Sequence, residues 1–176
     1  VEPEPAIAQV KPADPKPADP NMPTAPPAVI IPRAAIPDAQ QLAKTRKLFR
    51  DLFSKELASR EIQSRLALAR KLIDEGAKCP DQSVDKYVLL AAARQAALEG
   101  HDLQLSFSAI DALAAAFEVD GPEIKAQAAE KGLRGDSVAQ TWDNCRLAMP
   151  VVDELVADED YPAAIKLSVQ LQQLAA

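Results

Sequence analysis

The chain is 176 residues long, carries a net charge of −6 and is 48% hydrophobic, yet only 4% of its residues are aromatic. The negative charge argues against general nucleic-acid binding, because contacts to phosphates require a surplus of Lys and Arg. The apolar content is mostly alanine and leucine, and there are only five glycines. This composition favours close-packed helices over a turn-rich β-fold.

Residues 1–37 contain eleven of the fifteen prolines and no glycine, and they include the direct repeat KPADP-KPADP at residues 11–20. Proline at this density fixes φ and removes backbone donors, so that neither a helix nor a sheet can propagate. We predict a disordered, extended linker of the polyproline type over residues 1–37, which tethers the folded part of the protein. Recognition of a PxxP motif by a partner domain is the alternative.

After Pro37 the pattern changes, and apolar residues recur at three- and four-residue spacing, as in amphipathic helices. We predict one helical domain over residues 38–176, with about six or seven helices paired as antiparallel hairpins. The expected helices cover about residues 38–59, 60–76, 82–99, 102–118, 121–131, 136–156 and 160–176. Because the last of them reaches Ala176 without a cap, we expect the helix or the array to continue in the full-length protein.

The helix over residues 136–156 has the most regular apolar stripe, formed by Val138, Trp142, Cys145, Met149, Val152 and Val156. Asp136 is its expected N-cap. Because an apolar stripe faces the core, we expect Cys145 to be a small buried hydrophobe.

The sequence leaves open whether Cys79 and Cys145 pair in a disulfide. Pro150 lies inside the helix and is expected to kink it in the preceding turn.

Charge is distributed unevenly along the helices. Residues 44–71 carry nine basic residues against three acidic ones, a local charge of +6, whereas residues 136–176 carry seven acidic residues against two basic ones, a local charge of −5. We interpret the basic run from Lys44 to Arg50 as the solvated face of an amphipathic helix, with contact to anionic lipid or to an acidic partner as the alternative. A further alternative is that the basic first hairpin of one copy faces the acidic last hairpin of another.

Two inter-helix turns resemble those of tetratricopeptide repeats. Residues 160–165 read Asp-Tyr-Pro-Ala-Ala-Ile, similar to the G-D-Y-x-x-A-I step of that family, and residues 100–110 read Gly-His-Asp-Leu-Gln-Leu-Ser-Phe-Ser-Ala-Ile, a looser version. The two turns lie about 60 residues apart, whereas the family repeats at roughly 34 residues, and the W-x2-L-G-x2-Y signature is absent. The resemblance implies a short TPR-like α-solenoid with an irregular repeat.

Residues 48–76 and 85–120 are similar to helical regions in large secreted or envelope proteins of planctomycete-type bacteria. The residues that carry this resemblance include LFxxxFxxxLA at 48–58 and AIDxLA at 109–114. In such proteins the helical module accompanies enzymatic or carbohydrate-binding domains. The resemblance implies an extracytoplasmic location, in the periplasm or the cell envelope, with a Pro-rich linker that follows a signal peptide.

The chain has no G-x-S-x-G, no H-E-x-x-H and no Gly-rich phosphate loop, so we expect neither an enzyme nor a cofactor. His101, the only histidine, is interpreted as a solvated turn residue rather than a general base. One His and two separated Cys are too few ligands for a zinc site, and the acidic residues over 153–160 lack the spacing of a calcium-binding EF-hand. No apolar run approaches the about 18 residues that a transmembrane helix needs.

We therefore expect a non-catalytic interaction or scaffold module that binds a protein, a peptide or another domain of its own chain on the concave face of the helical array. An accessory helical domain of a multidomain envelope hydrolase or carbohydrate-processing protein is the alternative. The candidate binding residues are Tyr87, Arg94, Trp142, Arg146 and Tyr161. For each of these, a place in the core or on the plain helix surface is the competing interpretation.

Overall fold

The computed structural model describes residues 32–175 of the chain, and within this range it contains eight helices and no strand. The all-α class predicted from the sequence is confirmed. Residues 1–31, which make up most of the predicted linker, lie outside the described residues. The helices are α1 (Ala39–Leu52), α2 (Ser54–Ala58), α3 (Ile62–Lys78), α4 (Val84–Glu99), α5 (Leu103–Ala116), α6 (Gly121–Gly132), α7 (Val138–Ala157) and α8 (Tyr161–Ala175).

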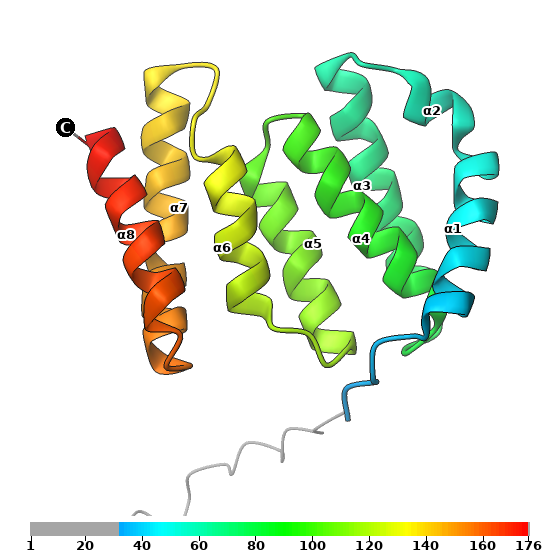
Figure 1. The fold of residues 1–176 in the computed structure, drawn as a ribbon. Coiled ribbons are helices and arrows are strands. Elements are labelled where there is room, and N and C mark those ends of the chain that lie inside the picture. The colour runs from blue at the N-terminus through cyan, green and yellow to red at the C-terminus, as the bar shows by residue number, and fades with distance from the viewer. Residues whose placement is uncertain (1–31, 176) are drawn as a thin grey trace, which may run out of the picture. The chain divides into compact units, whose positions relative to one another are not determined.

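From α3 to α8, helices that follow one another lie side by side and alternate in direction, as antiparallel hairpins (Figure 1). Helix α4 packs between α3 and α5. Its residues Ala93 and Ala97 are fully buried in a cluster that includes Leu72 of α3 and Ala109 of α5. Small side chains at these positions let the neighbouring helices approach closely. This alanine-rich helix therefore contacts neighbours on both sides.

The first predicted helix is split in two at Phe53, which explains why eight helices form where six or seven were expected. Phe53 leaves the helical conformation (φ −102°, ψ 19°), and its ring is buried, 5.0 Å from the ring of Phe49 between centroids. The ammonium of Lys71, on α3, lies 5.1 Å from the centre of the Phe53 ring. Burial of this ring against α3 outweighs the continuation of α1, since tertiary packing overrides local helix propensity.

The two turns that resemble tetratricopeptide repeats share one backbone geometry. In each, a residue with positive φ follows the last helical turn, His101 at 59° and Glu159 at 63°. The next residue donates its N–H to a carbonyl five residues back, Asp102 to Ala97 and Asp160 to Leu155, both at 2.9 Å. This pattern satisfies carbonyls that a helix end would otherwise leave unpaired. The aspartate of each turn then caps the following helix.

The predicted N-cap of α7 is wrong by one residue. Ser137, not Asp136, occupies the N-cap position, and its hydroxyl accepts a hydrogen bond from the backbone N–H of Gln140 at 3.1 Å. The Asp136 carboxylate instead lies 2.6 Å from Nδ1 of His101 in the α4–α5 turn, a partner that is 35 residues away in the sequence. The Asp136 side chain is thus engaged with another loop and does not cap α7.

Substitution of Ser137 by alanine tests this assignment. We expect Ser137→Ala to lower the free energy of unfolding by about 1 kcal/mol, because the N–H of Gln140 loses its acceptor. Asp136→Ala removes only an exposed contact and is expected to cost less. Urea denaturation followed by circular dichroism measures both. A larger loss for Asp136→Ala than for Ser137→Ala would contradict the cap assignment.

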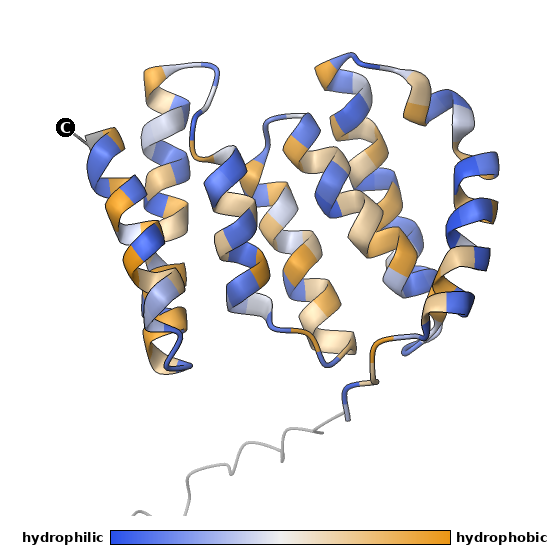
Figure 2. Cartoon of the chain, viewed as in Figure 1, coloured by the Kyte–Doolittle hydropathy of each residue, from blue (hydrophilic) through white to orange (hydrophobic). Residues whose placement is uncertain are grey.

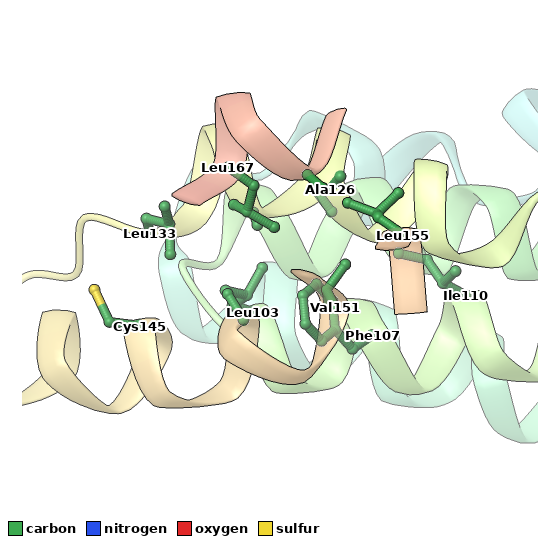
Figure 3. Close-up of a cluster of buried hydrophobic side chains, with 13 residues drawn as sticks. Leu103, Phe107, Ile110, Ala126, Leu133, Cys145, Val151, Leu155 and Leu167 are labelled. Carbon is green, nitrogen blue, oxygen red and sulfur yellow. The ribbon is translucent and has the colours of Figure 1, made fainter. Parts of the chain in front are cut away.

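The largest buried cluster lies between α5, α6, α7 and α8. Leu103, Phe107 and Val151 converge at its centre, as Figure 3 shows, with Leu155 of α7 and Leu167 of α8 beside them. Alanines of α6, α7 and α8 fill part of the remaining interface. Because α7 and α8 contribute to the same core as α5 and α6, the last hairpin is held at a fixed position against the rest of the array.

Residues 32–37, the last part of the predicted linker, contact the helical domain. Ala34 pairs with the end of α5: its N–H donates to the carbonyl of Ala116 at 2.9 Å, and its own carbonyl accepts from Glu118 at 2.7 Å. The Gln82 side chain donates to the carbonyl of Pro32 at 2.8 Å. The segment thereby satisfies backbone groups beyond the end of α5, so its contacts belong to the folded domain.

Candidate functional site

Helix α7 buries a different face from the one that its apolar stripe predicts. The buried residues are Asn144, Cys145, Ala148, Val151 and Leu155. Of the predicted stripe, Cys145 is buried as expected, and burial raises the pKa of its thiol. Neither Cys145 nor Cys79 takes part in a disulfide. Trp142 is 52% exposed and Met149 is 61% exposed, and Val138 and Val156 are exposed as well. These four residues of the stripe therefore face outward, which corrects the expectation of a core face, whereas Cys145 and the half-buried Val152 contact the core.

Two polar contacts explain this orientation of α7. The Asn144 amide is buried and donates to the carbonyl of Gly132 at the end of α6, at 2.8 Å. Lys125 of α6 bridges Asp111 of α5 and Glu154 of α7, at 2.8 and 3.1 Å. Burial by itself would lower the pKa of Lys125, but the hydrogen bonds to the two carboxylates outweigh burial and raise that pKa. Together these contacts turn the Trp142 side of α7 away from α6.

The outward face of α7 meets the outward face of α8 along a groove of about 540 Å³. Its walls are Trp142, Arg146, Met149 and Val152 of α7 and Leu171 and Gln172 of α8. On α8, Tyr161, Ile165 and Val169 are also exposed and extend the apolar surface at four-residue spacing. Figure 2 shows hydrophobic segments on both α7 and α8, interleaved with hydrophilic ones. We call this surface the α7–α8 groove.

The five residues proposed from the sequence do not gather on one surface. Trp142 and Arg146 line the α7–α8 groove, and Tyr161 is exposed at the start of α8. Tyr87 is half-buried, and its ring packs edge-on against the ring of Phe117, with centroids 5.1 Å apart. Arg94 lies on α4 and lines a separate cavity. Only the α7–α8 members of the set can therefore contribute to one binding surface.

Sequence reasoning missed two features. Met149 and Leu171 line the groove, but the amphipathic pattern assigned Met149 to the core and said nothing of Leu171. It also missed a cavity of about 410 Å³ between α1, α2, α3 and α4, lined by several arginines including Arg94. The signal for the cavity was present as the excess of basic residues over 44–71. The sequence did not predict that arginines of α1, α3 and α4 lie around one cavity, because this depends on how the helices pack.

His101 connects the α4–α5 turn to the start of α7. Its ring pairs with Asp136, and its carbonyl accepts a hydrogen bond from the Gln140 side chain at 2.8 Å, so that the α4–α5 turn is fastened to the loop before α7. Over residues 32–175, no three His, Cys, Asp or Glu side chains are grouped so that they could hold a metal ion. In the same range, no helix is both long enough and apolar enough to cross a bilayer.

Comparison with known proteins does not assign the chain to a family. No family model matches the chain, and no curated protein or solved structure shows significant similarity to it. The groove and the cavity are therefore the features from which a function is argued.

Proposed function

We propose that the helical domain is a non-catalytic interaction module, a short TPR-like α-solenoid that binds an amphipathic helix of a partner in the α7–α8 groove. The partner helix belongs to another protein or to a further domain of the same chain, and the Pro-rich segment acts as the spacer. The observation that carries this proposal is the row of large apolar side chains left exposed on α7 and α8 around a groove of about 540 Å³. Exposed apolar patches of this kind mark interaction sites.

The residue types of the groove support protein binding. Trp, Tyr and Arg are the residues that most often dominate binding energy at protein interfaces, and Trp142, Tyr161 and Arg146 lie in or beside the groove. Met149 has a flexible side chain that adapts to different apolar surfaces. Arg146 and Asp153 supply one charge of each sign at the margin, where they can pair with charged residues beside the apolar stripe of a partner.

The arrangement of the domain favours a helix as the occupant. Helix α4 and the other inner helices bury apolar side chains against neighbours on both sides, whereas α7 and α8 leave this face uncovered. A helix with apolar residues at i, i+3, i+4 and i+7 would fill the space between two parallel ridges of side chains, as in other helix-in-groove complexes. Such a helix would extend the antiparallel array by one member.

Selection of helical peptides on the full chain tests the proposal. We expect a phage-displayed library of amphipathic helices to yield peptides that bind in the micromolar range, measured by isothermal titration calorimetry. The double variant Trp142→Ala/Met149→Ala should weaken this binding at least about tenfold, because truncation of a central interface residue costs about 2 kcal/mol or more. Trp142 is the only tryptophan, so its fluorescence should shift to shorter wavelength when a peptide covers the groove.

The matched control is Leu48→Ala/Leu52→Ala, which removes two exposed apolar side chains from α1, at the other end of the array. This variant should bind the selected peptides as the wild type does. Peptides that bind Trp142→Ala/Met149→Ala with unchanged affinity, or that leave Trp142 fluorescence unchanged, would contradict the proposed site.

A further inference from the structure

The cavity between α1, α2, α3 and α4 combines arginines with an apolar lining. Four guanidinium groups line it, those of Arg46, Arg50, Arg65 and Arg94, against one carboxylate, that of Glu99. Phe49, Leu57 and Val88 provide part of the apolar lining. Like charges that converge on a partly enclosed space create a positive potential, which attracts anions. We call this site the arginine cavity.

Most of these arginines have no counter-charge within the described part of the chain. Glu99 pairs with Arg65, with 3.2 Å between Oε2 and Nε. Among residues 32–175, Arg46, Arg50 and Arg94 form no ion pair, and Nε of Arg94 is buried without a hydrogen-bond acceptor. A buried donor without a partner is unfavourable, and a guanidinium binds a carboxylate through two parallel hydrogen bonds. The cavity therefore has the chemistry of a carboxylate site.

The turn between α7 and α8 has the complementary chemistry. Asp158 and Glu159 are exposed and form no ion pair in the described residues, and Glu159 occupies the left-handed conformation (φ 63°) at the turn. Asp160 is engaged as the cap of α8, where it accepts the N–H of Ala163. The exposed ring of Tyr161 follows directly. We call residues 158–161 the acidic turn: it offers two unpaired carboxylates beside an aromatic ring.

We infer that the arginine cavity binds the acidic turn of a second copy of this chain. The carboxylates of Asp158 and Glu159 pair with Arg46, Arg50 and Arg94, and the Tyr161 ring lies against the apolar lining beside Phe49. A copy cannot fill its own cavity, because α1 and the α7–α8 hairpin lie at opposite ends of the array (Figure 1). The contact is therefore head to tail, and each copy keeps one cavity and one turn available for the next.

Sedimentation velocity of the full chain tests the inference. At a protein concentration of about 100 μM we expect the weight-average mass to rise above that of the monomer in about 50 mM NaCl. It should return to the monomer value in about 500 mM NaCl, because added salt screens the attraction between partly exposed charges. A chain that stays monomeric at low salt overturns the proposal.

Charge-reversed variants then identify the two surfaces. Arg46→Glu/Arg50→Glu and Asp158→Lys/Glu159→Lys should each be monomeric at low salt, with circular dichroism spectra like that of the wild type. When the two variants are mixed, the intact turn of the first should bind the intact cavity of the second, so that the mixture associates although neither variant does so alone. Failure of the mixture to associate would overturn the head-to-tail pairing.

Two controls separate this contact from other sources of association. Lys44→Glu/Lys47→Glu makes the same change of charge on α1 at residues that do not line the cavity, so it should still associate. Trp142→Ala/Met149→Ala should also associate, because neither residue belongs to the arginine cavity or to the acidic turn. Loss of association in either control, to the same extent as in Arg46→Glu/Arg50→Glu, would overturn the inference. The peptide-binding proposal is tested independently, by the binding of selected peptides to the α7–α8 groove.

Discussion

Phe117→Ala is expected to destabilise the protein by about 3–5 kcal/mol, the usual cost of truncating a buried aromatic side chain. Phe117 is fully buried at the end of α5 and packs with Leu90 and Leu113. Its ring also contacts the edge of Tyr87, and its backbone pairs with Ala34. The substitution would therefore leave a cavity at the point where α4, α5 and residues 32–37 meet. A loss of this size is a large share of the stability of an ordinary domain.

The same chemical change at Phe49 is the control. Phe49 is only half-buried, on α1, and its ring contacts Phe53. We expect Phe49→Ala to cost clearly less, because solvent already reaches part of the ring and truncation leaves a smaller void. Urea denaturation of both variants gives the comparison. Equal losses would mean that the junction around Phe117 packs no more tightly than the α1 surface.

Ala93→Leu is expected to destabilise the protein by about 1–3 kcal/mol, because a larger side chain has no space between α3 and α5. Ala93 is fully buried on α4, and its cluster includes Leu72 of α3 and Ala109 of α5. Leucine has nearly the helix propensity of alanine, so that the loss would report packing between helices rather than helix formation. The expected result is a lower midpoint of thermal and urea unfolding with unchanged helical content.

Ala67→Leu is the matched control for this effect. Ala67 is exposed in the middle of α3, so the added carbons would extend into solvent. We expect its stability to stay within about 0.5 kcal/mol of the wild type, as for most surface substitutions. If Ala93→Leu were tolerated equally well, the close approach of α3 and α5 to α4 would not be the reason for the alanines of α4.

The contrast between α4 and α7 shows how far periodicity predicts burial. On α4 the small residues lie on several faces, and Ala93 and Ala97 are buried in a cluster that includes residues of both α3 and α5. On α7 two apolar stripes are present, one through Trp142 and Met149 and one through Ala148 and Leu155. Hydrophobic periodicity does not rank one stripe above the other. The choice depends on which side chains fit against α6.

Contacts between residues distant in the sequence account for the other differences. The split of the first helix at Phe53 depends on α3, to which Lys71 belongs. The shift of the α7 cap from Asp136 to Ser137 accompanies the pairing of Asp136 with His101. Lys71 and His101 are far in the sequence from Phe53 and Asp136, so the spacing of residues along one helix cannot predict these contacts. Local signals therefore located the helices, and missed the places where a loop or a helix end is held by another part of the fold.

The sequence by itself determined that this protein is helical, where its hairpin turns fall, and that its charge is divided between a basic first part and an acidic last part. These properties depend on residue type and short-range spacing, which a single sequence contains. Tertiary structure alone decided that Trp142 and Met149 face outward and that Arg46, Arg50 and Arg94 share one cavity. The reason is that helix rotation is settled by packing, because Asn144 and Ala148 fit against the neighbouring helices and the Trp142 ring is left outside.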